Sequence, residues 1–234
     1  RHVWLQLTPM NSRGSSYANS IAAAFSAAAK VTRSDVFGAE NDRWLPKNYQ
    51  DDARLPFLGY VGARFCPGGV VLMAINPGGG SDKYKKTSED ERLCPVLERL
   101  RESSSQQAAV AAGDAFQNYI EVLPRWNLWR IVNPVLKAID ADVHSIAFLN
   151  VVPFRTRNDA SPNIKARNYS WNKIVSPLLR VLEPSRIIAL GKKAGDMVQQ
   201  CKTEDVGLVT VPRTNGDKYV SPEAQSVLDA LSRD

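Results

Sequence analysis

Cysteine and histidine are scarce in this chain of 234 residues. Its three cysteines, Cys66, Cys94 and Cys201, and its two histidines, His2 and His144, lie far apart in the sequence. None has the close spacing of a zinc-binding motif, and three cysteines are too few for a four-cysteine iron–sulfur cluster. We therefore expect no metal and no cofactor. Scattered cysteines also favour a reducing compartment, which predicts a cytoplasmic protein rather than a secreted one.

Long apolar runs and extreme compositions are missing too. The longest runs, such as 21–25 and 70–75, are far shorter than the roughly 18–20 residues that cross a bilayer. Hydrophobic residues make up 44% and charged residues 23%, which excludes collagen-like, fully disordered and disulfide-scaffold proteins. We expect a globular protein of one or two domains, monomeric and without a membrane partner.

The net charge of +6 is small, but it is unevenly distributed. Residues 155–193 contain nine basic and two acidic side chains, so this segment alone exceeds the excess of the whole chain. A neutral globule with one basic segment suits a partner with a phosphate backbone. A solvated helix face is the alternative explanation of the same pattern.

Short apolar runs alternate with helical patterns after residue 67. Continuous apolar runs between turn residues predict strands buried on both faces, at 70–75, 145–149, 186–190 and 207–211. Helices are predicted at 15–30, 87–101, 106–122, 126–140, 168–182, 192–201 and 222–232. This alternation predicts an α/β fold, a three-layer αβα sandwich with a central, mainly parallel four-stranded sheet. Residues 68–234 would form this domain, and 1–67 a helical and irregular arm packed on it as one structural unit.

Polar residues cluster where the predicted strands end. Ligands of open parallel sheets bind beyond the carboxyl ends of the strands. Asn76 follows the first strand and Asn150 ends the second, and an amide can both donate and accept hydrogen bonds. Asn and Gly also simply terminate strands, which would explain part of the pattern. The triple glycine at 78–80 lacks the spacing of phosphate-binding and dinucleotide-binding loops, although its N–H groups could approach an anion closely.

Four segments carry a family resemblance. The chain has A-I-N-P-G at 74–78, F-L-N at 148–150, I-A-L-G-K-K-A at 188–194 and V-P-R-T-N-G at 211–216, the last followed by a final helix. In order and spacing these segments resemble the uracil-DNA glycosylase superfamily, and most closely its mismatch-specific uracil and thymine-DNA glycosylase branch. The resemblance covers about two thirds of the chain. Ala74 stands where that branch usually has Gly, and the segment at 211–216 lacks the common His-Pro-Ser or Asn-Pro-Ser core.

The resemblance implies a DNA glycosylase without metal or cofactor. Such an enzyme flips a nucleotide out of the stack and hydrolyses the N-glycosidic bond of uracil or a related damaged or modified base, a step of base excision repair. Asn76 would position the attacking water, and Asp82 could act as a general base or merely cap a helix. The partner would be single- or double-stranded DNA, and the location the cytoplasm, in association with the nucleoid, or the nucleus.

The resemblance also suggests residues that hold the base and the strand. Asn150 would read the flipped base, the backbone at Gly78 and Gly79 could donate to it, and Tyr84 could close one wall. Phe57, Phe65 or Phe154 could stack on the base, and of these three Phe154 is included among the predicted base-binding residues. The residues expected to contact DNA are Arg155, Arg157, Lys192, Lys193, Arg213, Thr214, Asn215 and Gly216.

Two other hypotheses stay open. The chain could be a nucleic-acid-binding or nucleotide-binding member of the same fold without catalysis, because Asn76 is not a carboxylate and the segment at 211–216 departs from the family. A protein-interaction or regulatory α/β domain is the third, less favoured because the strand-end loops are typical of a ligand site.

Overall fold

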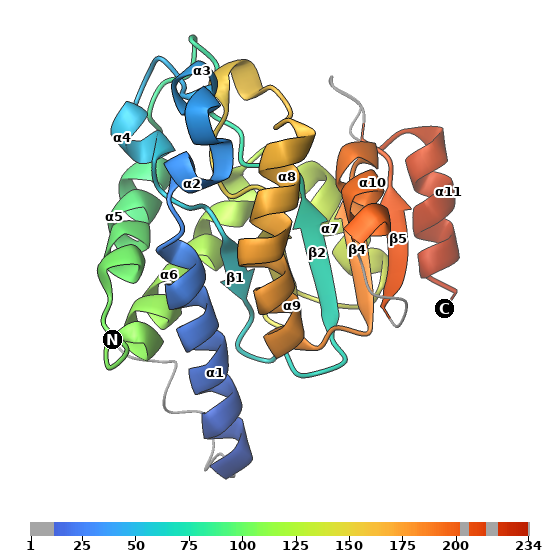
Figure 1. Cartoon of the computed structure of the whole chain (residues 1–234). Coiled ribbons are helices and arrows are strands. Elements are labelled where there is room, and N and C mark those ends of the chain that lie inside the picture. Colours follow the sequence, from blue (N-terminus) through green and yellow to red (C-terminus); the bar gives the residue numbers. More distant parts are fainter. Residues whose placement is uncertain (1–11, 202–205, 214–219, 234) are drawn as a thin grey trace.

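The structure is a computed structural model that describes residues 12–201, 206–213 and 220–233. Its centre is a five-stranded sheet in the order β1-β3-β2-β4-β5. Strands β2 to β5 run parallel to one another, and β1 pairs antiparallel with β3 at one edge (Figure 1). The strands are β1 (Gly59–Val61), β2 (Val70–Ala74), β3 (Ala147–Asn150), β4 (Arg186–Leu190) and β5 (Gly207–Val211).

The four predicted strands are all present, and two of them have the predicted bounds. The expectation of a four-stranded sheet is wrong by one strand, because β1 lies in the segment assigned to the arm. Gly59 begins β1 with a φ of +118°, and an ideal Cβ at this position would lie 1.8 Å from the carbonyl oxygen of Phe148. A side chain is therefore excluded exactly where β1 meets β3, and the resulting short, glycine-bounded segment shows no strand pattern.

Helices lie on both faces of the sheet, as in a three-layer arrangement. In Figure 1, α8, α9 and α10 lie in front of the sheet and α7 lies behind it. The helices are α1 (Ser12–Ala29), α2 (Arg33–Phe37), α3 (Asn41–Trp44), α4 (Gln50–Ala53), α5 (Ser88–Glu102), α6 (Ala108–Val122), α7 (Trp129–Ala138), α8 (Ile164–Ser170), α9 (Ser176–Leu182), α10 (Lys192–Cys201) and α11 (Pro222–Leu231), with short turns η1 (Gly38–Glu40), η2 (Leu123–Arg125), η3 (Arg157–Asp159) and the π-helical η4 (Trp171–Val175).

The predicted helix starts have a clear local cause. The Thr87 hydroxyl accepts from the backbone N–H of Asp90, whose side chain accepts from the Thr87 N–H, and this reciprocal capping box begins α5. The Ser221 hydroxyl accepts from the Ala224 N–H and so caps α11, directly before Pro222. In contrast, the helix expected at 168–182 begins earlier, at α8, and continues through η4 into α9.

The segment before residue 67 is built into the domain. Helices α2, α3 and α4 lie at the end of the molecule toward which the parallel strands point (Figure 1). The Arg157 guanidinium donates to the backbone oxygens of Leu45 and Asp42, at 2.9 and 3.1 Å, and so ties α3 and its following turn to the loop after β3. This part of the chain therefore borders the region in which a parallel sheet binds its ligands.

No helix among the described residues is long and apolar enough to cross a membrane.

The close approach at Gly59 predicts an unequal pair of variants. Gly59→Ala should lower the free energy of unfolding by about 3 kcal/mol or more, because it adds a clash with the β3 backbone to an unfavourable φ. Gly68→Ala has a similar φ of +83° but open space around the new methyl group, so it should cost only about 1 kcal/mol. Denaturant unfolding of the two variants measures the difference, and equal losses would contradict this account of the β1–β3 contact.

Candidate functional site

The candidate site lies where two neighbouring parallel strands end. Ala74, the last residue of β2, pairs in parallel register with Asn150, the last residue of β3. The ladder continues beyond the strands, because the N–H groups of Val151 and Val152 donate to the oxygens of Ala74 and Ile75, at 2.8 and 2.9 Å. The start of the loop that carries Asn76 is therefore held beside the end of β3.

A chain of hydrogen bonds fixes the orientation of the Asn76 amide. The Thr156 hydroxyl donates its single hydrogen to the Ala160 carbonyl oxygen, at 2.5 Å. That hydroxyl must then accept from Asn76, whose Nδ2 lies 3.1 Å away. The amide is held with its nitrogen toward Thr156, and its Oδ1 accepts no hydrogen bond from any residue that the structure describes. Thr156 itself is fully buried, and sequence analysis did not single it out.

The glycine loop after β2 is clamped at one end and open at the other. The Gly80 N–H donates to the Asp159 carboxylate at 2.6 Å, and the Gly80 oxygen accepts from the Asn158 N–H at 2.8 Å. An ideal Cβ at Gly80 would lie 1.7 Å from the Thr156 oxygen, so only glycine fits. Gly78 is exposed, and nothing lies within 4 Å of its ideal Cβ. A ligand could therefore approach the backbone at Gly78.

A buried ion pair lies beneath this loop. The Arg155 guanidinium contacts the Asp90 carboxylate at 2.5 Å, with both side chains at most 5% exposed. The Tyr84 hydroxyl donates to the same carboxylate, and Gly79 lies above the cluster, since its ideal Cβ would be 3.0 Å from Arg155 Cζ and 3.1 Å from Tyr84 Cζ. The Arg155 guanidinium also lies 4.5 Å from the ring centroid of Phe57. In sequence Asp90 has only the spacing of a helix cap, three residues after Thr87, and nothing there indicates its distant partner.

The protonation states of the cluster follow from these contacts. Burial alone would lower the pKa of Arg155, but the hydrogen bond and charge of Asp90 outweigh it and raise the pKa. Burial, with the hydrogen bond to Asp90 as the next cause, raises the pKa of Tyr84 to about 12. The cluster is therefore a fixed ion pair with a neutral phenol near neutral pH, and it positions the loop rather than transferring protons.

The residues expected to hold the base are mostly buried. Asn150 is 4% exposed, its Nδ2 donates to the Phe57 oxygen at 2.7 Å, and its Oδ1 is buried without a hydrogen-bond partner among the described residues. Phe57 and Phe154 are at most 1% exposed and Phe65 is 8% exposed, so none presents a ring for stacking in this conformation. The expected stacking role of Phe154 needs a rearrangement of the core.

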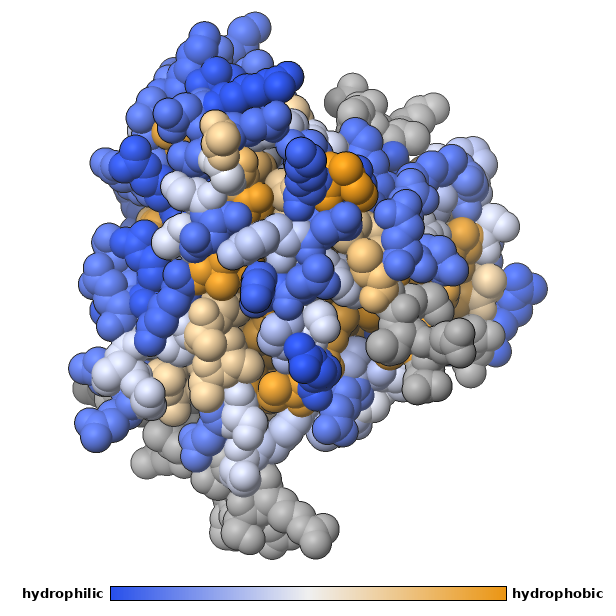
Figure 2. Space-filling view, viewed as in Figure 1, coloured by the Kyte–Doolittle hydropathy of each residue, from blue (hydrophilic) through white to orange (hydrophobic). Residues whose placement is uncertain are grey.

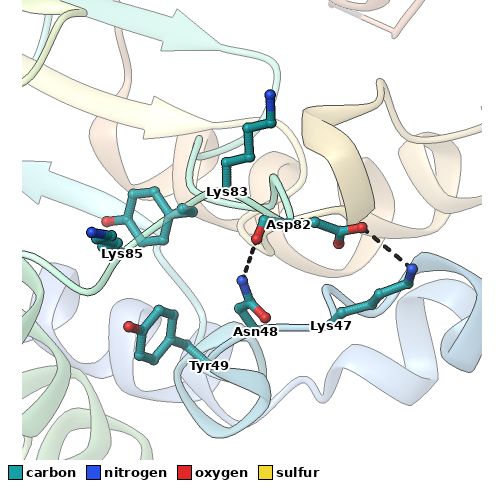
Figure 3. A pocket seen from close by; sticks show the side chains of 7 residues that line it. Lys47, Asn48, Tyr49, Asp82, Lys83 and Lys85 are labelled. Carbon is teal, nitrogen blue, oxygen red and sulfur yellow. Dashed lines mark hydrogen bonds and ion pairs between the residues drawn. The ribbon is translucent and has the colours of Figure 1, made fainter.

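Asp82 faces the arm across an open pocket. Its carboxylate lies 3.3 Å from the Lys47 ammonium, and its backbone oxygen accepts from Asn48 at 2.6 Å (Figure 3). Because Asp82 precedes no helix directly, the expectation of a helix cap does not describe it; the α5 cap is Thr87. Its observed contacts are those of an ion pair that joins the loop after β2 to the arm.

The expected DNA contacts divide into buried, anchored and exposed residues. Arg155 is buried in its ion pair and is not available to a phosphate in this conformation, whereas Arg157 is half-buried and donates to backbone oxygens of the arm. Lys192 and Lys193 are exposed, next to Glu223 at 3.6 Å and Ser161 at 2.8 Å. Arg213 is exposed beside Gly191. The remaining expected contacts lie outside the described residues: Thr214, Asn215 and Gly216.

Within the described parts of the chain, no group of His, Cys, Asp and Glu side chains is placed to hold a metal ion. No protein-family model matches the chain, and a comparison with curated proteins finds no match.

The buried pair predicts a double-mutant result. Asp90→Asn should cost about 3–5 kcal/mol of unfolding free energy, because it leaves the Arg155 charge buried without a counter-charge. Asp90→Leu combined with Arg155→Met removes both charges and should recover a large part of that loss. Denaturant unfolding of the variants tests this, and a double variant that is less stable than Asp90→Asn would contradict the ion-pair account.

Proposed function

We propose that the chain is a monofunctional DNA N-glycosylase with a uracil-DNA glycosylase-like sandwich. Its substrate is uracil or a related damaged or modified base in DNA, and it acts by base flipping and water attack, without metal or cofactor. The observation that carries the proposal is the Asn76 amide, which Thr156 holds with its oxygen uncommitted to any described residue. The motif resemblance at 74–78 and 148–150 supports the same assignment.

The amide oxygen suits the positioning of a water molecule. Hydrolysis of the N-glycosidic bond places a water against C1′ of the sugar while the base leaves with the bonding electrons, through a transition state with positive charge on the sugar. The attacking water releases one proton to solvent and the base anion takes one up, so the products are the free base and an abasic sugar. Oδ1 of Asn76 accepts one water hydrogen and so aims a lone pair at C1′. An amide does not take up the proton as a carboxylate would, so the contribution of Asn76 is orientation.

The departing base carries negative charge, and N–H donors stabilise it. Gly78 is exposed with open space around it, and its backbone can approach a base oxygen closely. Asn150 is the residue to read the base edge, since its buried Oδ1 lacks a partner among the described residues and an unsatisfied buried acceptor costs about 1–3 kcal/mol. A base N–H that reached this oxygen would remove that cost.

A DNA-binding protein of the same fold without catalysis is the second candidate. The observation that favours it is the ion pair between Asp82 and Lys47. Asp82 is the acidic residue nearest in sequence to Asn76 and the candidate general base, and its carboxylate is engaged by the Lys47 ammonium. The two candidates differ in base release, which only the first predicts. The second predicts salt-dependent DNA binding without release, and Asn76→Ala should leave that binding unchanged.

The first test is release of free base from uracil-containing oligonucleotides, single-stranded and paired as U:G and U:A, followed by mass spectrometry. Release is expected, and Asn76→Ala should lower the rate about 100-fold or more because the water loses its orienting acceptor. Lys137→Gln, on the exposed surface of α7, is the matched control and should retain the full rate. Absence of release from all three substrates would contradict the uracil assignment, and a screen of other modified bases would then decide between the two candidates.

A second prediction concerns the residue behind the amide. Thr156→Val keeps the side-chain shape but removes the hydroxyl that orients Asn76, so kcat should fall about 10-fold or more with little change in KM. Thr156→Ser restores the hydroxyl and should restore most of kcat. If Thr156 had a merely structural role, both variants would change stability without this split between kcat and KM. Equal kcat values for the two variants would refute the orienting role.

A further inference from the structure

An open pocket lies beside the candidate site, between the arm and the loop after β2. It encloses about 700 Å³ and is lined by Lys47, Asn48 and Tyr49 from the arm and by Asp82, Lys83, Tyr84 and Lys85 from the loop (Figure 3). We call it the Tyr49 pocket. All of these residues lie outside the motifs at 74–78 and 148–150 on which the proposed function rests, although Asp82 and Tyr84 were candidate site residues. The proposed function therefore does not explain the pocket.

The pocket is positively charged, and two of its cations are uncommitted. It contains three lysines against one carboxylate, and that carboxylate is paired with Lys47 at 3.3 Å. Lys83 and Lys85 are exposed and have no carboxylate partner among the described residues. Figure 2 shows that hydrophilic side chains cover the end of the molecule that carries α3 and α4. The excess of lysines over carboxylates in the pocket attracts an anion.

The lining of the pocket also includes an exposed aromatic residue. Tyr49 is 41% exposed, and its ring meets that of Tyr84 edge-on, with centroids 6.2 Å apart at 89°. Its φ of 51° lies in the left-handed region, which a tyrosine adopts at a cost of roughly 1–3 kcal/mol. The backbone oxygen of Tyr49 accepts from the Ala53 N–H at 3.0 Å, and the preceding Asn48 donates to the Asp82 backbone oxygen. Hydrogen bonds therefore fix the chain on both sides of Tyr49. The structure thus maintains a strained residue whose ring faces solvent.

The pocket and the candidate site share a wall. Tyr84 lines the pocket, and its ring also lies beneath Gly79, where an ideal Cβ would be 3.1 Å from its Cζ. The loop from Gly78 to Lys85 runs directly from one to the other. A strand with one nucleotide at Gly78 therefore has a neighbouring nucleotide within reach of the pocket.

We propose that the Tyr49 pocket binds a nucleotide of the substrate strand next to the one that enters the candidate site. Lys83 and Lys85 contact its phosphates, and the Tyr49 ring offers a face on which its base stacks. Aromatic faces beside lysines are the general means by which proteins hold single strands without regard to sequence. An acidic peptide would use the lysines, but its carboxylates offer no aromatic face to stack on the ring. The inference rests on the proposed function for the identity of the neighbouring nucleotide.

Binding of a uracil-free fluorescent oligothymidylate to the full chain tests the proposal independently of catalysis. Lys83→Gln combined with Lys85→Gln removes two phosphate contacts, so the slope of log affinity against log salt should become shallower by about 1.4. The matched control is Lys137→Gln combined with Arg180→Gln, which removes two exposed cations near the C-terminal ends of α7 and α9. These helices lead into β3 and β4, so the two cations lie toward the amino ends of the strands, opposite the candidate site. The control should leave the slope unchanged, and equal slopes for both pairs would overturn the proposal.

The ring is tested by two substitutions at one position. Tyr49→Leu removes the aromatic face and should weaken oligothymidylate binding roughly 5- to 150-fold, the range of one stacked base. Tyr49→Phe keeps the face and should bind as the unchanged protein does. Thermal unfolding of both variants checks that they are folded. If Tyr49→Leu and Tyr49→Phe bind equally, the stacking assignment is overturned.

Two competitors identify the ligand class. Thymidine monophosphate should compete far more weakly than the oligonucleotide, and equal competition would overturn the assignment to a strand. Polyglutamate of matched charge should also compete weakly, and equal competition would replace nucleic acid by an acidic peptide. Pocket-dependent oligonucleotide binding without base release from any substrate would refute the proposed enzyme function and leave the pocket assignment standing.

Discussion

The ion pair between Arg155 and Asp90 is the contact on which the candidate site depends. It joins the loop after β3 to the distant first turn of α5 and, through Tyr84 and Gly79, to the loop after β2 that leads into this helix. Two charges buried to this degree are stable together and very costly apart. The pair therefore fixes the relative position of both strand-end loops, and the backbone at Gly78 is displayed on a support that cannot easily shift.

A second constraint works through direction rather than charge. Asparagine is ambiguous as a functional residue, because its amide can present either a donor or an acceptor. The hydroxyl of Thr156 removes the ambiguity. Because it donates its only hydrogen to the Ala160 oxygen, it can only accept a hydrogen bond from Asn76, and the donor must be Nδ2. The buried position of Thr156, maintained by the close contact of Gly80 with its backbone, makes the orientation permanent. The two constraints thus have separate roles: one holds the loop and the other aims its side chain.

The sequence predicts the parallel core well, because buried strands appear as continuous apolar runs; β4 and β5 have the predicted bounds, and β2 and β3 pair in parallel register. The sequence does not predict β1, because the backbone contact with β3 requires glycine at position 59 and the short segment lacks a strand-like apolar pattern. It also misses the supporting residues. Asp90 looks like a helix cap in sequence and Thr156 like a loop residue, and what defines their roles is a partner 65 or 80 positions away. Local patterns carry no information about such partners.

Charge shows the same limit in a different way. The segment 155–193 holds an excess of basic residues, which favours a DNA contact along it. Folding uses two of these cations internally: Arg155 neutralises Asp90, and Arg157 holds the arm through backbone oxygens. The exposed cations without a carboxylate partner among the described residues include Lys83 and Lys85, from a segment with no notable excess in the sequence. A count of charged residues along the sequence includes cations that become buried or paired when the chain folds. A phosphate group, in contrast, interacts with the unpaired cations that are exposed at the surface. The electrostatic surface beside the candidate site is therefore built by the loop after β2 and the arm, not by the basic segment alone.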